Sequence, residues 1–117
     1  MLKAHLQKLL SGMPEITGVA IVGQDGIPLE IMTRGDFDGN ALAAEFADLV
    51  KGMNSRLNGA NMGVLSGMMV ETPQHRIVIE PVAADYFLLG VVRPGGLMGR
   101  VRFLLKKAGL DIAPELA

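Results

Sequence analysis

Apolar side chains recur with helical spacing in three stretches of the chain. In residues 2–13 and 97–108 they return every three or four positions, with charged side chains between them, which is the pattern of amphipathic helices. The longest stretch is Asn40–Asn58, and its large apolar residues share one stripe: Leu42, Phe46, Leu49, Val50, Met53 and Leu57. We expect this stripe to face the core, with Asp38 or Asn40 capping the helix.

Five further stretches lack this period and are expected to form strands: 18–23, 27–33, 62–72, 76–80 and 86–92. The first and the last are apolar on both faces of the pleat, which is typical of central strands. The second follows an Asp-Gly turn, a strong hairpin signal. It also contains Pro28, which cannot donate to a ladder and therefore favours a sheet edge.

The element order α-β-β-α-β-β-β-α predicts an α+β domain with a five-stranded antiparallel sheet. Pairing the two central strands with each other gives the strand order 2-1-5-4-3. Residues 1–109 would form one domain, because Gly109 is expected to end the last helix. Residues 110–117 would then be a short, loosely held C-terminal tail.

The two edges of this predicted sheet differ. Residues 62–70 contain no proline, no lysine and no other charge, so the edge they form is open to pairing with another strand. A second copy of the chain is the simplest partner, since a two-fold axis there would also bring the two central helices together. We expect the dimer interface to use small or flexible residues of the helix and the edge: Ala44, Gly52, Met53, Met62, Val64, Ser66 and Met68.

Charge and composition argue against binding to nucleic acid or to a membrane. The net charge of −1 and the 4% aromatic content give neither a basic patch nor stacking residues for nucleic acid. No apolar run reaches the roughly 20 residues of a membrane span. The chain has no cysteine, which fits a reducing compartment, so we expect a cytoplasmic protein that binds neither nucleic acid nor a membrane.

The sequence shows no recognisable set of catalytic residues. The two histidines, His5 and His75, have no carboxylate nearby in sequence to orient them. Residues 94–100 contain three glycines after an expected strand, but they lack the spacing of a P-loop or a dinucleotide fingerprint. No nucleophile, base and orienting group come together. We therefore expect no catalytic residue, no cofactor and no metal.

The chain resembles the roadblock family of dynein light chains and bacterial GTPase regulators. The resemblance covers residues 2–108. It rests on G-V-A-I-V-G-Q-D-G-I-P-L from Gly18, on the alanine-rich helix from Ala41, on the strand pair around Val70 and Ile77, and on Tyr86–Leu89 leading into Pro94–Gly99. It implies a profilin-like sandwich and an obligate dimer with a ten-stranded sheet and antiparallel middle helices. The stand-alone bacterial members include a regulator of gliding-motility polarity, which binds a small Ras-like GTPase and stimulates hydrolysis without inserting a catalytic arginine.

Together these observations favour a homodimeric, non-enzymatic regulator or scaffold that binds a small Ras-like GTPase. The polar residues of the middle helix are the expected contacts with this partner: Glu45, Asp48, Lys51, Ser55 and Arg56. A small-molecule sensor is the alternative hypothesis, because a sheet flanked by helices can also enclose a ligand pocket. An enzyme ranks last.

Overall fold

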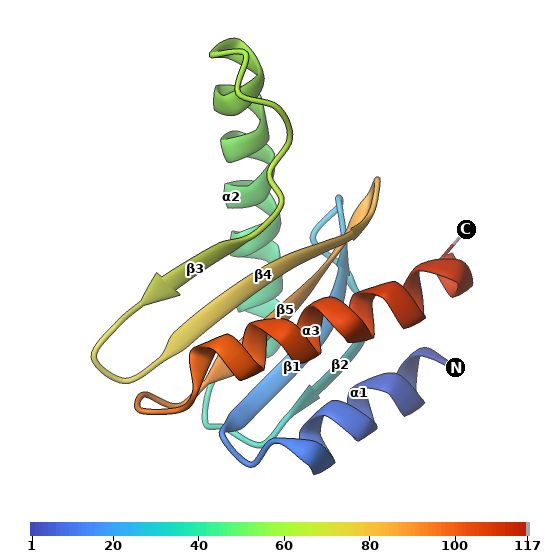
Figure 1. Ribbon diagram of the computed structural model, residues 1–117, viewed down its shortest axis with the longest axis vertical. Helices are drawn as coiled ribbons and strands as arrows, with labels where there is room; N and C mark the ends of the chain where they lie inside the picture. The colour runs from blue at the N-terminus through green and yellow to red at the C-terminus, as the bar shows by residue number, and fades with distance from the viewer. Residues whose placement is uncertain (117) are drawn as a thin grey trace.

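Figure 1 shows the computed structural model of the protein, which describes residues 1–116. Helices cover both faces of one antiparallel sheet, with α1 and α3 side by side on the near face and α2 behind it. The elements in chain order are α1 (Leu2–Gly12), β1 (Ile16–Gly23), β2 (Pro28–Thr33), α2 (Gly39–Gly59), β3 (Met68–Glu71), β4 (Arg76–Ala83), β5 (Tyr86–Val92), α3 (Met98–Ile112) and the 3₁₀ turn η1 (Ala113–Leu116).

The strand order is β2-β1-β5-β4-β3 and every neighbouring pair is antiparallel, which confirms the predicted topology. The central strands are β1 and β5, which pair along almost their whole length from Ile16↔Val92 to Gly23↔Tyr86. All residues of β1 are buried, and so are all residues of β5 after Tyr86. Because both faces of these two strands are covered, the residues that point to either face are apolar.

Each face of the sheet has its own hydrophobic core. On the α1/α3 side, residues such as Ile21, Leu88 and Leu105 are fully buried. On the α2 side the core is smaller and rests on Val22, Ile79 and the alanines of α2; it also includes Ala20, Ile77, Phe87 and Leu89. The α2 residues fully buried in this core are alanines, and the larger Leu42, Phe46 and Val50 pack against it only partly buried.

Local signals place the turns and caps as expected. The Asp38 side chain accepts a hydrogen bond from the Ala41 N–H at 3.0 Å and caps α2. Gly26 adopts a φ of 81° in the β1–β2 turn, where a glycine avoids steric strain. The helix α2 ends where Asn61 takes a φ of 58° and the Met62 N–H bonds back to the Leu57 carbonyl at 2.9 Å.

Two strand boundaries differ from the prediction by three or more residues. The strand expected over residues 62–72 is ordered as β3 only from Met68 to Glu71. Conversely β4 continues through Pro81 to Ala83, although the predicted strand ends at Glu80. Pro81 is tolerated because the β4–β5 register shifts between Pro81 and Ala83 and because β3 pairs with β4 only as far as Ile79, so no ladder bond requires its missing N–H.

The expected end of the last helix at Gly109 is wrong. The helix α3 runs on to Ile112, and Gly109 does not have the positive φ of a helix-ending glycine. Ile112 is fully buried in the α1/α3 core and continues the apolar line of Val101 and Leu105. Tertiary burial thus outweighs the helix-weakening effect of glycine. Ala117, the last residue of the tail assigned to residues 110–117, lies outside the described residues.

Candidate interaction surface

Alanines form the centre of the contact between α2 and its own sheet, and the predicted apolar stripe packs at the margin of this contact. Ala43 is 0% exposed and Ala47 is 6% exposed, whereas Leu49 of the large apolar stripe is 41% exposed. The β1–β2 turn explains this orientation, because a Cβ on Gly26 would lie 3.2 Å from the Ala44 Cα. Only small residues let the helix approach so closely. The predicted stripe therefore packs against the core through Leu42, Phe46 and Val50 at the margin of the contact, while Leu49 stays exposed.

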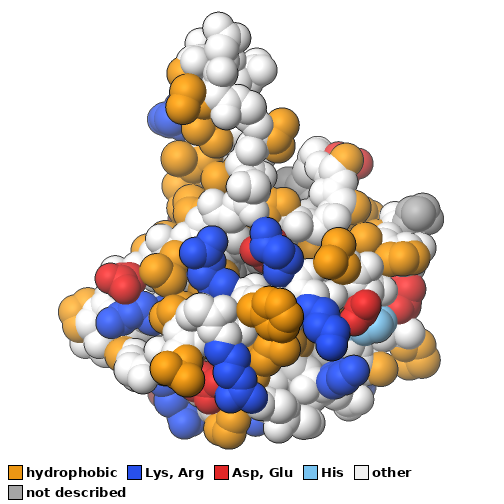
Figure 2. Space-filling view, viewed as in Figure 1, with side chains coloured by type: hydrophobic (Ala, Val, Ile, Leu, Met, Phe, Trp, Pro, Cys, Tyr) orange, Lys and Arg blue, Asp and Glu red, His pale blue; other side chains and the backbone are white. Residues whose placement is uncertain are grey.

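The large apolar residues of α2 consequently lie beside the sheet. Leu42, Phe46 and Val50 are half-buried along the flank of the smaller core, and Met53 and Leu57 are also half-buried. Figure 1 shows that the second half of α2 extends beyond the end of the sheet, and Figure 2 shows apolar side chains on that projecting part. An incompletely buried stripe of this length is typical of a helix that packs against another molecule.

The segment after α2 runs back along the helix. The Asn54 side chain holds it by accepting a hydrogen bond from the Leu65 N–H at 2.8 Å. Two apolar residues of this segment face solvent: Met62 is 72% exposed and Val64 is 82% exposed. The segment thus extends the exposed apolar surface of α2.

One edge of the sheet is unpaired beside this surface. Within the described residues β3 pairs only with β4. The Thr72 N–H bonds to the His75 carbonyl at 2.8 Å, and Val70 pairs with Ile77 in the same register. Because hydrogen-bonded positions alternate along an antiparallel strand, the backbone groups of Met69 and Glu71 point away from β4 and remain available to another strand.

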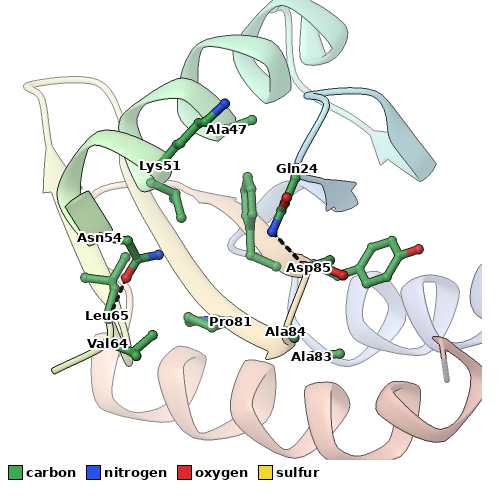
Figure 3. A pocket seen from close by; sticks show the side chains of 13 residues that line it. Gln24, Ala47, Lys51, Asn54, Val64, Leu65, Pro81, Ala83, Ala84 and Asp85 are labelled. Atoms are coloured by element: carbon green, nitrogen blue, oxygen red, sulfur yellow. Dashed lines mark hydrogen bonds between the residues drawn. The ribbon is translucent and has the colours of Figure 1, made fainter. Parts of the chain in front are cut away.

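A pocket of about 300 Å³ lies between α2, the returning segment and the β4–β5 hairpin. Its apolar lining includes Val50, Leu65 and Phe87, and its polar lining includes Lys51 and Asn54. Figure 3 shows these residues with two hydrogen bonds that hold the walls, Asn54 to Leu65 and Gln24 to Asp85. Sequence reasoning missed this pocket, because its walls come from four segments far apart in the chain.

The residues expected at the dimer interface differ in exposure and in their place in the fold. Met53 and Met68 are half-buried, while Ser66, Met62 and Val64 are exposed on the returning segment. Ser66 precedes β3 and is not part of the ladder with β4. Gly52 meets no other part of the fold closely: an added Cβ would be near only the Arg56 guanidinium, at 3.0 Å.

The residues expected to bind a partner all lie on α2 and are all exposed: Glu45, Asp48, Lys51, Ser55 and Arg56. Glu45, Asp48 and Ser55 share one face of the helix, on the side away from Ala43. Arg56 folds back and donates a hydrogen bond to the Gly52 carbonyl at 3.1 Å. Lys51 instead lines the pocket, so it is set apart from the other four.

The remaining ionisable candidates have structural partners. His5 lies 2.6 Å from the Glu115 carboxylate, which also contacts the N-terminal amine at 2.9 Å. The N-terminal amine, followed by His5, lowers the pKa of Glu115. The sequence could not show this pairing, because the two side chains are 110 positions apart. His75 packs edge-on against the Phe37 ring.

Residues 1–116 offer neither a metal-binding cluster nor a membrane-spanning helix. No group of three or more histidine, aspartate or glutamate side chains there is arranged to hold a metal ion. No helix in that range combines the length and the apolar character that a membrane span requires. The glycine-rich residues 94–97 form a turn before α3, with a φ of 87° at Gly95.

Comparison with known proteins places the chain in a family. The Roadblock/LC7 domain model matches residues 2–93. Myxococcus xanthus MglB has the same fold, with a TM-score of 0.90 at 17% sequence identity, over 98% of this chain and 94% of that one. A Roadblock/LC7 domain from Streptomyces avermitilis gives 0.87 at 14% identity, over 97% of this chain and 96% of that one. Acanthamoeba castellanii profilin II gives 0.67 at 16% identity, over 100% of both chains. No curated protein sequence matches this chain significantly.

Proposed function

Because the chain belongs to the Roadblock/LC7 family, we propose that it is a homodimeric regulator or scaffold without enzymatic activity, which binds a small Ras-like GTPase. The observation that carries the proposal is the incompletely buried apolar stripe of α2 beside the open edge of β3. A partner that pairs with the β3 edge can also cover the apolar stripe of α2.

A second copy of the chain fits both features. Antiparallel pairing of two β3 edges across a two-fold axis would satisfy the outward backbone groups of Met69 and Glu71 in both copies. The same axis would lay the two α2 stripes against each other and cover Leu49. Burying one large apolar side chain stabilises an interface by about 1.5–3 kcal/mol, so a few such residues per subunit suffice for a stable dimer.

The GTPase would then bind the polar outer face of the paired helices. Glu45, Asp48 and Ser55 remain on that face when the apolar stripe is covered, and their mixture of charge and hydrogen-bonding groups suits the rim of a protein interface. The regulator would act by binding one arrangement of the GTPase switch loops more tightly than the others, which shifts their population without chemistry from this chain.

The test combines mass and hydrolysis measurements. Light scattering should give twice the chain mass, and the dimer should change the rate of GTP hydrolysis by a Ras-like GTPase from the same genome. The double variant Glu45→Gln/Asp48→Asn should weaken binding roughly tenfold, the size of effect expected for lost charged contacts. The variant Gln7→Lys/Ser11→Lys changes the net charge equally on α1 and should bind normally. A monomer, or a dimer that neither binds nor affects any such GTPase, would rule out the proposal.

A small-molecule sensor is the second candidate, and the pocket lined by Val50, Leu65 and Phe87 is the observation that favours it. Its volume of about 300 Å³ matches the lower limit for ligand pockets. A bound metabolite would raise the melting temperature of the wild-type protein. The substitution Ala84→Trp, at an exposed position that lines the pocket, should fill it and abolish that rise. A metabolite panel that leaves the melting temperature unchanged would exclude this candidate.

A further inference from the structure

A groove of about 270 Å³ separates α1 and α3 on the face of the sheet opposite α2. One line of residues from each helix forms it: positions 5, 8, 9 and 12 of α1, and positions 100, 104, 107, 108 and 111 of α3, together with Met13. These positions follow the helical period, so each helix turns a single face to the groove. The groove is thus a continuous feature along both helices.

Small residues create this hollow. A Cβ placed on Gly12 would meet no other atom within 4 Å, and Ala108 faces the same space from α3. The other apolar residues that line the groove are Leu9, Met13 and Leu104, all at least half-buried. Gly12 adds no side chain to this space and Ala108 adds only a methyl group, so an apolar channel open to solvent remains between the helices.

Basic side chains border this channel. Lys8, Arg100 and Lys107 all line it, and none of the three forms an ion pair within residues 1–116. His5 and the one carboxylate, Asp111, line it as well. Figure 2 shows blue lysine and arginine side chains around an orange apolar patch on this face. The channel is therefore positively charged on a chain whose net charge is −1.

An exposed aromatic residue lies next to the groove. Phe103 on α3 is 67% exposed, and Lys106 and Lys107 lie one helical turn further along, on either side of it. Phenylalanine in a solvent-facing position, with cations on both sides, departs from the polar outer face that an amphipathic helix normally presents. Apolar and basic groups are thus combined both inside the groove and beside it.

We propose that the α1/α3 groove binds an acidic amphipathic helix of a partner protein. Apolar side chains spaced i, i+3, i+4 and i+7 on that helix would fill the channel, while its carboxylates meet Lys8 on one wall and Arg100 and Lys107 on the other. Concave shape favours a helix over a lipid surface, which would be flat on this scale. Charge complementarity selects an acidic helix and excludes a basic one.

The geometry limits the length of the bound segment. The groove spans twelve positions of α3, from Arg100 to Asp111, which corresponds to about 16 Å at the rise of an α-helix. A partner helix of roughly three turns covers that distance. The site lies on the face of the sheet opposite α2 and uses none of the residues assigned to the dimer or the GTPase, so the two functions can fail independently.

A display library of random helix-forming peptides of this length tests the proposal on the wild-type protein. The selected sequences should be acidic, with apolar residues at helical spacing. In fluorescence anisotropy, the double variant Arg100→Glu/Lys107→Glu should bind the best peptide at least roughly tenfold more weakly, as expected when attractive charge pairs become repulsive. The variant Lys3→Glu/Arg93→Glu changes the net charge equally outside the groove and should bind as the wild type does.

Changes in the peptide keep the test valid if a protein variant folds poorly. Replacing the peptide's glutamates by glutamines, or its apolar residues by serine, should each reduce binding to the wild type. Selection of neutral or basic peptides, or an acidic peptide whose affinity is unchanged by Arg100→Glu/Lys107→Glu, would overturn the proposal. So would groove-dependent binding of phosphatidylserine vesicles without any peptide binding, since that result would assign the surface to a membrane.

Discussion

Asn54 and Leu65 are joined by a side-chain-to-backbone hydrogen bond of 2.8 Å that fixes the segment following α2. The bond is the one side-chain hydrogen bond between this segment and the helix within the described part of the chain. It sets the position of Val64 and closes one wall of the pocket. A single asparagine therefore shapes both the exposed apolar surface and the pocket.

Replacing Asn54 by alanine should release the returning segment. The lost hydrogen bond predicts a decrease in the free energy of unfolding of about 1 kcal/mol, measured by urea denaturation, together with faster proteolysis within residues 60–67. Asn58→Ala is the matched control, because the Asn58 side chain makes no hydrogen bond in the described structure. Equal proteolysis of the two variants would show that Asn54 does not hold the segment.

Met69→Pro should prevent dimerisation while leaving the β3–β4 pairing intact. The Met69 N–H points away from β4, so proline there removes a donor of the open edge and none of the existing ladder. Light scattering should report a monomer for Met69→Pro and a dimer for Met69→Ala, which keeps the N–H. A proline variant with the dimer mass would place the interface elsewhere.

Leu49→Glu should also dissociate the dimer, through the helices rather than the edge. Leu49 is 41% exposed in the single chain, so a charge there costs the monomer little. In the dimer the same carboxylate would be buried without a partner, which is strongly unfavourable. Sedimentation should show monomers with near wild-type far-UV circular dichroism. Asp111→Leu, an exposed substitution on α3, should leave the mass unchanged.

Glu115→Gln should reduce stability at neutral pH but not in acid. The N-terminal amine and His5 lower the pKa of Glu115, so the stabilisation by this carboxylate is present above its unfolded-state pKa and is lost as the pH falls through its lowered folded-state pKa. In a chain that begins at Met1, the wild type should melt at a slightly higher temperature than the variant at neutral pH. The difference should vanish in strong acid, and a difference that does not depend on pH would contradict this account.

Local signals were sufficient for most of the fold. The continuous apolar runs of β1 and β5 identified the central strands, Pro28 identified one edge, and Asp38 identified the start of α2, because each of these features acts through neighbouring residues. The strand order followed once the two central strands were paired. Elements whose ends depend on distant contacts were placed less well, and the end of α3 at Ile112 is the clearest case.

The sequence by itself determined the α+β class, the strand order and the presence of a middle helix with more apolar surface than one sheet needs. Only the tertiary structure decided which side of that helix faces inward, because the close approach of Ala44 to Gly26 involves residues far apart in the chain. It likewise decided that Glu115 meets His5 and that α1 and α3 leave a basic groove. Helical periodicity shows which residues share a face, but the partner of each face depends on packing between elements, which no local pattern encodes.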